Sequence, residues 1–237
     1  MAELKAVIFD YYETLVELTQ PIRERHFDQL AREAGVALAP GEAYRHWREL
    51  TTSDQALRLG GERGPLNGAK PPFVTFREVW RQRSEELFQQ WGADLPAERG
   101  CDAHADLHAQ AAPYPEVIAA LGELSSRYDL AVLSDADDDF LLSNMRRNGL
   151  QFETIVSSEE LRAYKPHVSL FNETCARLGV QPSEAAYVGD TPWADIEGAR
   201  HAGLRAVWIN RHGADWSEDI RRPQYEIGSL DELAALL

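Results

Sequence analysis

Short apolar runs alternate with helical stretches through the second half of the chain. Runs of this kind, bounded by polar or glycine-containing turns, are typical of buried strands. They fall at residues 130–133, 154–156, 185–188 and 206–209, and a similar run at 4–9 stands near the N-terminus. Because strands that alternate with helices form parallel sheets covered on both faces, the pattern predicts an α/β fold with a doubly wound, Rossmann-like parallel sheet.

Residues from about 19 to 112 carry a different pattern, in which apolar and aromatic residues recur at helical spacing. Thr19-Gln20-Pro21 is typical of a helix start, because proline fits the first turn, and Gly35 is expected to end that helix. Three further helices and one loop rich in glycine and proline are expected. The helices fall around 44–50, from 76 to about 92, and from 96 or 101 to 111, and the loop falls at 60–72.

These two patterns divide the chain into two parts. We expect residues 1–15 and 113–237 to form the α/β core. Residues 16–112 are then an insertion after the first strand and form a helical cap domain. A chain of 237 residues is long enough for a core domain and a smaller one. The aromatic residues of the insertion are expected to fill its own core, and they include Phe76, Trp80, Phe88 and Trp91.

The composition is that of an ordinary globular protein, with 44% apolar and 27% charged residues. A net charge of −15 disfavours nucleic acid and anionic membranes as partners, because both bind basic surfaces. The N-terminus has no secretory signal pattern, and no apolar run approaches the ~20 residues of a membrane span. Cys101 and Cys175 are expected to be reduced thiols. We therefore expect a cytoplasmic protein with a small-molecule partner, as a monomer or homodimer.

Polar side chains follow the predicted strands at the points where the strands end. Asp10 ends the first strand, and a carboxylate there faces the crevice in which open α/β sheets bind ligands. Alone, Asp10 could equally start a turn or cap a helix. The later strand ends and one helix start supply further candidates. These are Ser134 and Asp135, Lys165, and Asp190 with Asp195.

In their order and spacing, these residues resemble the motifs of the haloacid dehalogenase (HAD) superfamily, and the likeness extends over nearly the whole chain. The four stretches that carry the resemblance are Phe9-Asp10-Tyr11-Tyr12-Glu13-Thr14-Leu15, Leu133-Ser134-Asp135, Tyr164-Lys165-Pro166, and Val188-Gly189-Asp190 with Asp195 five residues on. Each motif is weak alone, but all four in order, each in the expected strand or loop context, are specific.

The resemblance implies a role for each motif. Asp10 would attack the substrate and form a covalent ester, which splits one difficult displacement into two easier steps. Ser134 would hydrogen-bond the transferring group, and Lys165 would neutralise charge around Asp10. A Mg²⁺ ion would bind the carboxylates of Asp10 and Asp190 and the backbone carbonyl of Tyr12, with Asp195 supporting the site. Further expected substrate contacts come from Thr14, Asp135 and Arg48.

Tyr12 departs from the phosphatase pattern of the superfamily. Phosphatases usually have an aspartate two residues after the nucleophile, which protonates the leaving alcohol and contributes about 10²–10⁴-fold to the rate. A tyrosine, with an ordinary pKa near 10, suits that task poorly. Tyr12 is instead similar to the L-2-haloacid dehalogenase branch, whose halide leaves without a proton. Trp47-Arg48, Trp193 and residues 208–213 resemble the same branch.

The fourth motif favours the other branch. Dehalogenases of this kind typically have Ser-Ser-Asn where this chain has Val188-Gly189-Asp190, and they work without metal. A further carboxylate beside Asp10 makes sense mainly when a cation is bound. The sequence therefore predicts a Mg²⁺-dependent phosphatase of substrates with good leaving groups, with (S)-2-haloacid dehalogenase as the alternative. A non-catalytic module on the same fold is a third hypothesis, which the intact Asp10, Lys165 and Asp190 disfavour.

Weaker features allow two interpretations each. Residues 137–139 are all aspartate and could form a second metal site, but we expect them to cap the helix at 140–148. His104 and His108 have the spacing of a zinc pair, but a solvated helix face is expected. Arg45 could bind a substrate anion or lie on the surface. Glu13 is a candidate replacement for the missing acid, although its side chain should point elsewhere.

Overall fold

The computed structural model of the protein describes residues 2–51 and 63–237. Six strands among these residues form one parallel sheet in the order β3-β2-β1-β4-β5-β6. Their bounds are β1 Ala6–Phe9, β2 Asp129–Ser134, β3 Thr154–Ser157, β4 Ala185–Gly189, β5 Arg205–Ile209 and β6 Tyr225–Ile227. The predicted α/β fold is confirmed, and the five predicted strands lie where the apolar runs stand. The edge strand β6 was not predicted.

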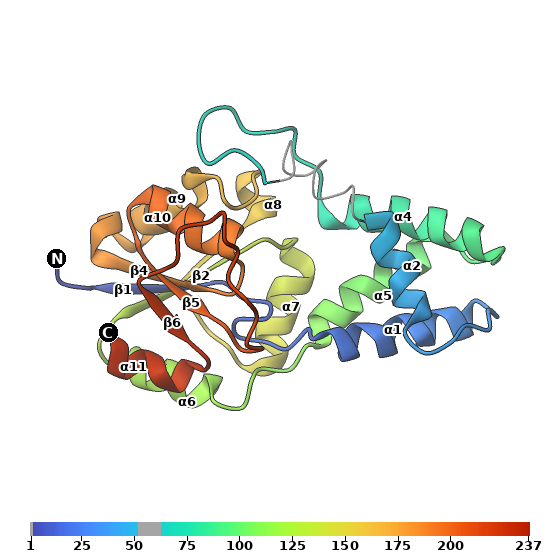
Figure 1. Ribbon diagram of the computed structural model, residues 1–237, viewed down its shortest axis with the longest axis horizontal. Helices are drawn as coiled ribbons and strands as arrows, with labels where there is room; N and C mark the ends of the chain where they lie inside the picture. Colours follow the sequence, from blue (N-terminus) through green and yellow to red (C-terminus); the bar gives the residue numbers. More distant parts are fainter. Residues whose placement is uncertain (1, 52–62) are drawn as a thin grey trace.

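The sheet is buried on both faces because alternate residues of each strand point to opposite sides. Val7 and Phe9 of β1 join one apolar cluster, and Ile8 joins the other. Helices cover each face, as Figure 1 shows. The first cluster includes residues of α6 Val117–Leu124, α7 Asp138–Asn148 and α11 Leu233–Leu236. The second includes residues of α9 Val168–Leu178 and α10 Gly198–Ala202, with part of α8 Ser158–Leu161 packed against it.

Short helical turns complete the sheet layer. They are η1 Pro182–Glu184, η2 Pro192–Glu197 and η3 Leu230–Glu232. The register of the central strand brings its end close to two neighbours, since Phe9 lies opposite Val132 of β2 and Val188 of β4. The residues that follow these three strands therefore share one edge of the sheet, which is the crevice expected from the sequence.

Four helices of the inserted segment lie beyond the carboxyl ends of the strands and pack against one another (Figure 1). They are α1 Gln20–Glu33, α2 Glu42–Thr51, α4 Phe76–Trp91 and α5 Ala97–Gln110, and we call them the helical bundle. Thr75 and Glu78 form a reciprocal capping box at the start of α4, and Gly92 ends it with φ 64°. All four predicted helices are confirmed in place.

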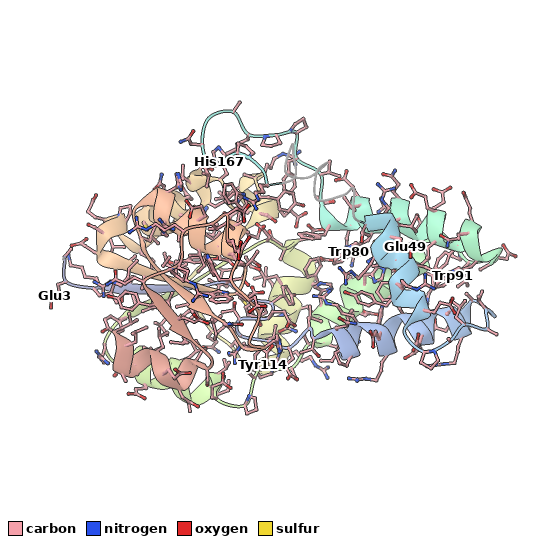
Figure 2. All side chains as sticks on the ribbon, viewed as in Figure 1. Glu3, Glu49, Trp80, Trp91, Tyr114 and His167 are labelled. Atoms are coloured by element: carbon pink, nitrogen blue, oxygen red, sulfur yellow. The ribbon has the colours of Figure 1, made fainter. Side chains whose placement is uncertain are left out.

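Two adjacent segments join the helical bundle to the sheet layer. Val16 and Pro113 form an antiparallel bridge, and Tyr114 N donates to Leu15 O over 3.1 Å. Figure 2 labels Tyr114 at this junction and Trp80 and Trp91 within the bundle. Of the expected loop at 60–72, the first three residues lie outside the described residues, and the rest contains no helix or strand. No helix of the described residues is long and apolar enough to span a membrane.

Candidate active site

A buried lysine lies at the centre of the strand-end cluster. Lys165 Nζ is 2.6 Å from Asp10 Oδ1 and 2.6 Å from Asp195 Oδ1, and it donates to the Tyr187 hydroxyl over 3.0 Å. These groups come from the ends or faces of separate elements: β1, the loop before α9, β4 and η2. The Tyr187 hydroxyl in turn donates to Asp195 Oδ1 over 2.9 Å. One cation is therefore shared by two carboxylates in a site from which water is largely excluded.

The protonation of this cluster follows from burial and from its own charges. Burial raises the pKa of Asp10 to about 7, although the Lys165 ammonium acts against this rise. Burial lowers the pKa of Lys165, but the facing carboxylates of Asp10 and Asp195 outweigh it and hold that pKa well above its ordinary value. Lys165 thus remains a cation, and it favours the ionised form of Asp10.

A third carboxylate, that of Asp190, stands at the end of β4. Oxygens of Asp10, Asp190 and Asp195 all lie within 4.8 Å of one another. Burial raises the pKa of Asp190 well above its ordinary value, and the charges of Asp195 and Asp10 raise it further. Gly189 allows this close approach, because a side chain at that position would overlap the carboxylate of Asp195.

This group of oxygens fits a hard divalent cation such as Mg²⁺, which prefers carboxylate and carbonyl ligands. Three carboxylates face one ammonium group, and a divalent cation would balance the excess negative charge. Asp195 is already committed, since Oδ1 accepts from Lys165 and Tyr187 and Oδ2 accepts from Thr191 N over 2.9 Å. The carboxylates of Asp10 and Asp190 are therefore better placed for direct binding, and Asp195 for support.

Other predicted site residues lie around the same edge of the sheet. Ser134 is buried at the end of β2, and Asp135 Oδ1 accepts from Lys165 N over 3.0 Å. Thr14 is buried, and its Oγ1 has no hydrogen-bond partner within the described part of the chain. The carbonyl of Thr14 accepts two N–H groups of Arg211, which fixes the loop that follows Asp10.

Tyr12 contributes no acid of useful strength to this site. Its ring packs against Tyr11, His108 and Phe140, with the His108 centroid 5.0 Å away. Its hydroxyl is buried and has no hydrogen-bond partner among residues 2–51 and 63–237. Burial raises the pKa of Tyr12 well above its ordinary value, and the Tyr11 and Asp10 charges act in the same direction. Tyr12 therefore holds its proton and suits a shuttle even less than an exposed tyrosine does.

Glu13 is held within the loop after β1. It adopts the left-handed conformation, with φ 64°, which costs energy for any residue other than glycine. Its Oε1 accepts from Leu18 N, and its Oε2 lies 3.2 Å from His212 Nε2 and 3.4 Å from the Tyr114 hydroxyl. These contacts explain how the strained residue is retained, and they bind its carboxylate to the loop and the bundle junction.

A cavity of about 350 Å³ opens between the helical bundle and this edge of the sheet. Its wall includes Tyr12 and Asp135 from the sheet layer and Arg48 from α2. The predicted substrate contact Arg48 is thus brought to the same cavity as two of the motif residues. Arg45 is not, since it pairs with Glu42 and Glu49 along the exposed face of α2.

Two expectations about the weaker features were wrong. His104 is 3% exposed among aromatic rings and His108 is half-buried beside it, so the pair forms no solvated face. The side chain of Asp137 makes no capping bond to α7. Instead, its two oxygens accept from Phe76 N and Arg77 N, over 2.9 and 2.8 Å, at the start of α4.

The sequence reasoning also missed Tyr187 and Arg23. Tyr187 lay in a run assigned as an apolar strand, yet a buried tyrosine hydroxyl needs a polar partner, and that requirement was the available signal. Arg23 of α1 lines the cavity, but nothing in the helical pattern of α1 distinguishes it from Arg25.

The model of haloacid dehalogenase-like hydrolases matches residues 4–203 of the chain. Because this match covers most of the chain, the protein belongs to that family of hydrolases, as the motifs predicted. The fold and the strand-end cluster described above lie within the matched region.

Individual relatives divide between two activities. (S)-2-haloacid dehalogenase 2 of Pseudomonas sp. (strain CBS-3) is 34% identical over 100% of this chain and 97% of its own length. Phosphoserine phosphatase of Thermus thermophilus is 30% identical over 97% of this chain and 98% of its own. The solved structure of the HAD-hydrolase YfnB from Bacillus subtilis, bound to magnesium, has a TM-score of 0.80 at 20% identity, covering 100% and 99% of the two chains. Identity alone therefore leaves the choice of activity to the site.

Proposed function

We propose that the protein is a Mg²⁺-dependent phosphatase that acts through a phosphoryl ester on Asp10. The observation that carries this proposal is the trio of Asp10, Asp190 and Asp195, whose oxygens lie within 4.8 Å of one another. Such a cluster with Lys165 as its bound ammonium group leaves a negative charge that a divalent cation would balance. The magnesium-bound structural neighbour supports the same choice of fold and ion.

In this proposal Asp10, Asp190 and the backbone carbonyl of Tyr12 hold the ion, and Asp195 supports them. The ion would offset the charge of a phosphate dianion beside the carboxylates. The residues of the chain perform the remaining tasks. Asp10 attacks phosphorus, so that an oxygen–phosphorus bond forms while the bond to the leaving group breaks. Water then attacks phosphorus, which releases inorganic phosphate and returns the Asp10 carboxylate.

The surrounding side chains orient and stabilise these steps. Lys165 keeps Asp10 ionised and donates to the anion that develops. The buried hydroxyls of Ser134 and Thr14 hydrogen-bond the phosphoryl oxygens, which accounts for a Thr14 Oγ1 with no partner in the described structure. Asp135 holds the backbone of Lys165 and thereby fixes the position of its side chain.

The leaving group must depart without strong acid help. Tyr12 keeps its proton, and the Glu13 carboxylate is bound to Leu18, Tyr114 and His212. We therefore propose substrates whose leaving groups are weakly basic, namely aryl phosphates, acyl phosphates or anhydrides. Residues 16–112 would act as the cap domain that selects among them, since the cavity beside Tyr12 is bounded by the helical bundle.

Tyr12 favours a second candidate, (S)-2-haloacid dehalogenation. A halide leaves without a proton, so the same residue is harmless to that reaction. Arg48, which lines the cavity with Tyr12, would then assist the departing halide. Two curated relatives of nearly full length, from Pseudomonas sp. (strain CBS-3) and Burkholderia cepacia, carry the corresponding name.

One comparison separates the two reactions. The purified protein is assayed with an aryl phosphate and with L-2-chloropropionate, each with Mg²⁺ and with EDTA. Phosphate release that EDTA abolishes supports the proposal. Halide release that persists in EDTA supports the dehalogenase instead. Asp10→Asn serves as the control in all four assays, because both reactions need the carboxylate and background hydrolysis does not.

A further inference from the structure

The cavity beside Tyr12 has mainly aromatic walls. Phe27 and Trp47 lie with ring centroids 5.2 Å apart, and Trp80 and Phe140 lie 5.1 Å apart, all four along the cavity. Aromatic faces and edges bind flat apolar groups well, and a cavity of about 350 Å³ is large enough for a single ring with small substituents. The chemistry of the wall thus favours an aromatic body over a short polar one.

Arg23 places a positive charge in the same wall. Its Nε donates to Leu18 O over 2.7 Å, which anchors the guanidinium group to the start of the bundle. No carboxylate within the described part of the chain pairs with Arg23. Its terminal N–H groups are therefore available to a ligand, and a guanidinium group binds a carboxylate through two parallel hydrogen bonds.

The histidines of the cavity add no charge. His108 Nδ1 lies 2.8 Å from the backbone carbonyl of His104, and because a carbonyl only accepts, the Nδ1 atom carries the proton. Burial lowers the pKa of His108 to about 3, and the charge of Arg23 acts in the same direction. His104 is likewise kept neutral, chiefly because burial lowers its pKa. The positive charge that faces the cavity therefore belongs to the arginines.

We propose that this cavity binds the leaving group of the substrate, that the group is an aromatic ring bearing a carboxylate, and that Arg23 recognises the carboxylate. The inference rests on the proposed function and narrows its substrate class to aryl or aroyl phosphates with a second anionic group. It also accounts for a chain that needs a weakly basic leaving group, since phenolates and benzoates are of that kind.

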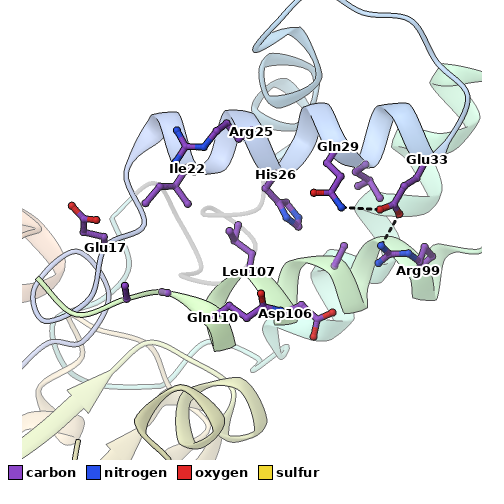
Figure 3. A pocket seen from close by; sticks show the side chains of 14 residues that line it. Glu17, Ile22, Arg25, His26, Gln29, Glu33, Arg99, Asp106, Leu107 and Gln110 are labelled. Carbon is purple, nitrogen blue, oxygen red and sulfur yellow. Dashed lines mark hydrogen bonds and ion pairs between the residues drawn. The ribbon is translucent and has the colours of Figure 1, made fainter. Parts of the chain in front are cut away.

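A separate groove provides the matched control. Arg25 is two residues from Arg23 on α1 but lines a groove of about 420 Å³ between α1 and α5. Figure 3 shows Arg25 there, with the Arg99–Glu33 ion pair of 2.6 Å farther along the groove. No strand-end carboxylate of the described structure lines that groove. Arg25→Gln therefore removes the same charge from the same helix without touching the aromatic cavity.

The test measures binding rather than turnover. Benzoate, benzamide and acetate are titrated into the wild-type protein in EDTA, with calorimetry and with the fluorescence of Trp47 and Trp80 as readouts. We expect benzoate to bind about tenfold more tightly than either of the other probes, because only benzoate offers both the ring and the charge. Arg23→Gln should lower benzoate affinity about tenfold and leave benzamide affinity unchanged, whereas Arg25→Gln should change neither.

Three results would overturn the inference. These are equal affinity for benzoate and benzamide, equal affinity for benzoate and acetate, or unchanged benzoate binding in Arg23→Gln. Arg23→Lys, which keeps a charge at the position, should restore part of the benzoate affinity and guards against a folding defect in the glutamine variant. Because binding is read without catalysis, a protein that selects benzoate but hydrolyses no phosphate would reject the proposed function alone. A phosphatase without that selection would reject the inference alone.

Discussion

Lys165 Nζ lies 2.6 Å from Asp10 Oδ1, and both side chains are almost completely buried. Breaking a buried ion pair from one side leaves an uncompensated charge in a dry site, which costs about 3–5 kcal/mol. Lys165→Met should therefore lower the free energy of unfolding by about that amount, measured by urea denaturation. It should also lower kcat by about 10²–10³-fold, because a donor to the developing anion is lost.

A surface pair gives the control for that variant. Lys5 pairs with Glu184, but its side chain is 55% exposed. Lys5→Met removes the same charge and should change unfolding and kcat little, since solvent screens exposed pairs. If the two variants unfolded at the same urea concentration, the buried pair would have no special role.

Glu13 is strained, and its carboxylate offsets the strain. Glu13→Ala keeps the left-handed backbone and removes the contacts to Leu18 and His212, so we expect it to be the least stable variant. Glu13→Gly also loses the contacts but relieves about 1 kcal/mol of backbone strain. Thermal or urea unfolding should therefore rank the wild type first, glycine second and alanine third.

The same variants test whether Glu13 acts as an acid. Because its carboxylate is bound within the loop, kcat for an aryl phosphate should stay within about threefold of the wild type in Glu13→Gln, a range far below a general acid's contribution. A fall of 10²-fold or more in a folded Glu13→Gln protein, with an altered pH profile, would assign Glu13 the role that we deny it.

Tyr12→Phe should be nearly silent. The hydroxyl has no hydrogen-bond partner in the described structure, so its removal breaks no bond and relieves the burial of a polar group. We expect unfolding to be unchanged or slightly more difficult, and kcat/KM for an aryl phosphate to change by less than about threefold, far less than loss of a general acid would give. A 10²-fold loss would show that the Tyr12 hydroxyl takes part in the reaction.

Asp137 ties the sheet layer to the helical bundle, and its contribution should depend on pH. Burial raises the pKa of Asp137 from 3.8 to about 6, with Glu159 and Asp139 adding to the rise, while the N–H groups of Phe76 and Arg77 oppose it. The folded protein therefore binds this proton more tightly than the unfolded chain. The associated stability is complete below about pH 4 and is lost as the pH rises through about 6.

Asp137→Asn isolates this effect, because asparagine has the same shape and does not titrate. The free energy of unfolding of the wild type, minus that of Asp137→Asn, should fall between pH 4 and pH 6 and level off above it. Subtracting the variant cancels the titration of all other carboxylates. A difference that stays constant, or rises, over this range would contradict the stated protonation of Asp137.

The strand ends could be predicted because they depend on local pattern. Each apolar run was followed at once by its polar residue, and a parallel sheet brings such ends together whatever the intervening sequence. Asp10, Ser134, Lys165 and Asp190 were therefore placed correctly around one edge. The strand β6 was missed because its three residues, Tyr225–Ile227, are too few and too polar to form an apolar run.

Other features depend on contacts between distant segments, which the pattern does not encode. Asp137 has the sequence context of a cap for its own helix, yet the start of α4, about sixty residues earlier, takes its carboxylate. His104 has the spacing of an exposed pair, but the rings of Phe27, Trp47 and Trp80 enclose it. Such burial is decided by how the helical bundle packs, and a single helix carries no signal of it.

The covalent group on Asp10 tests the central proposal most directly. The protein is mixed with an aryl phosphate, quenched in acid within one turnover, digested, and the peptide containing Asp10 is analysed by mass spectrometry. We predict a phosphoryl group on Asp10 in Mg²⁺, and none in EDTA or in Asp10→Asn. An unmodified Asp10 under these conditions, with a carboxyalkyl ester after L-2-chloropropionate in EDTA, would contradict the proposal and identify a dehalogenase.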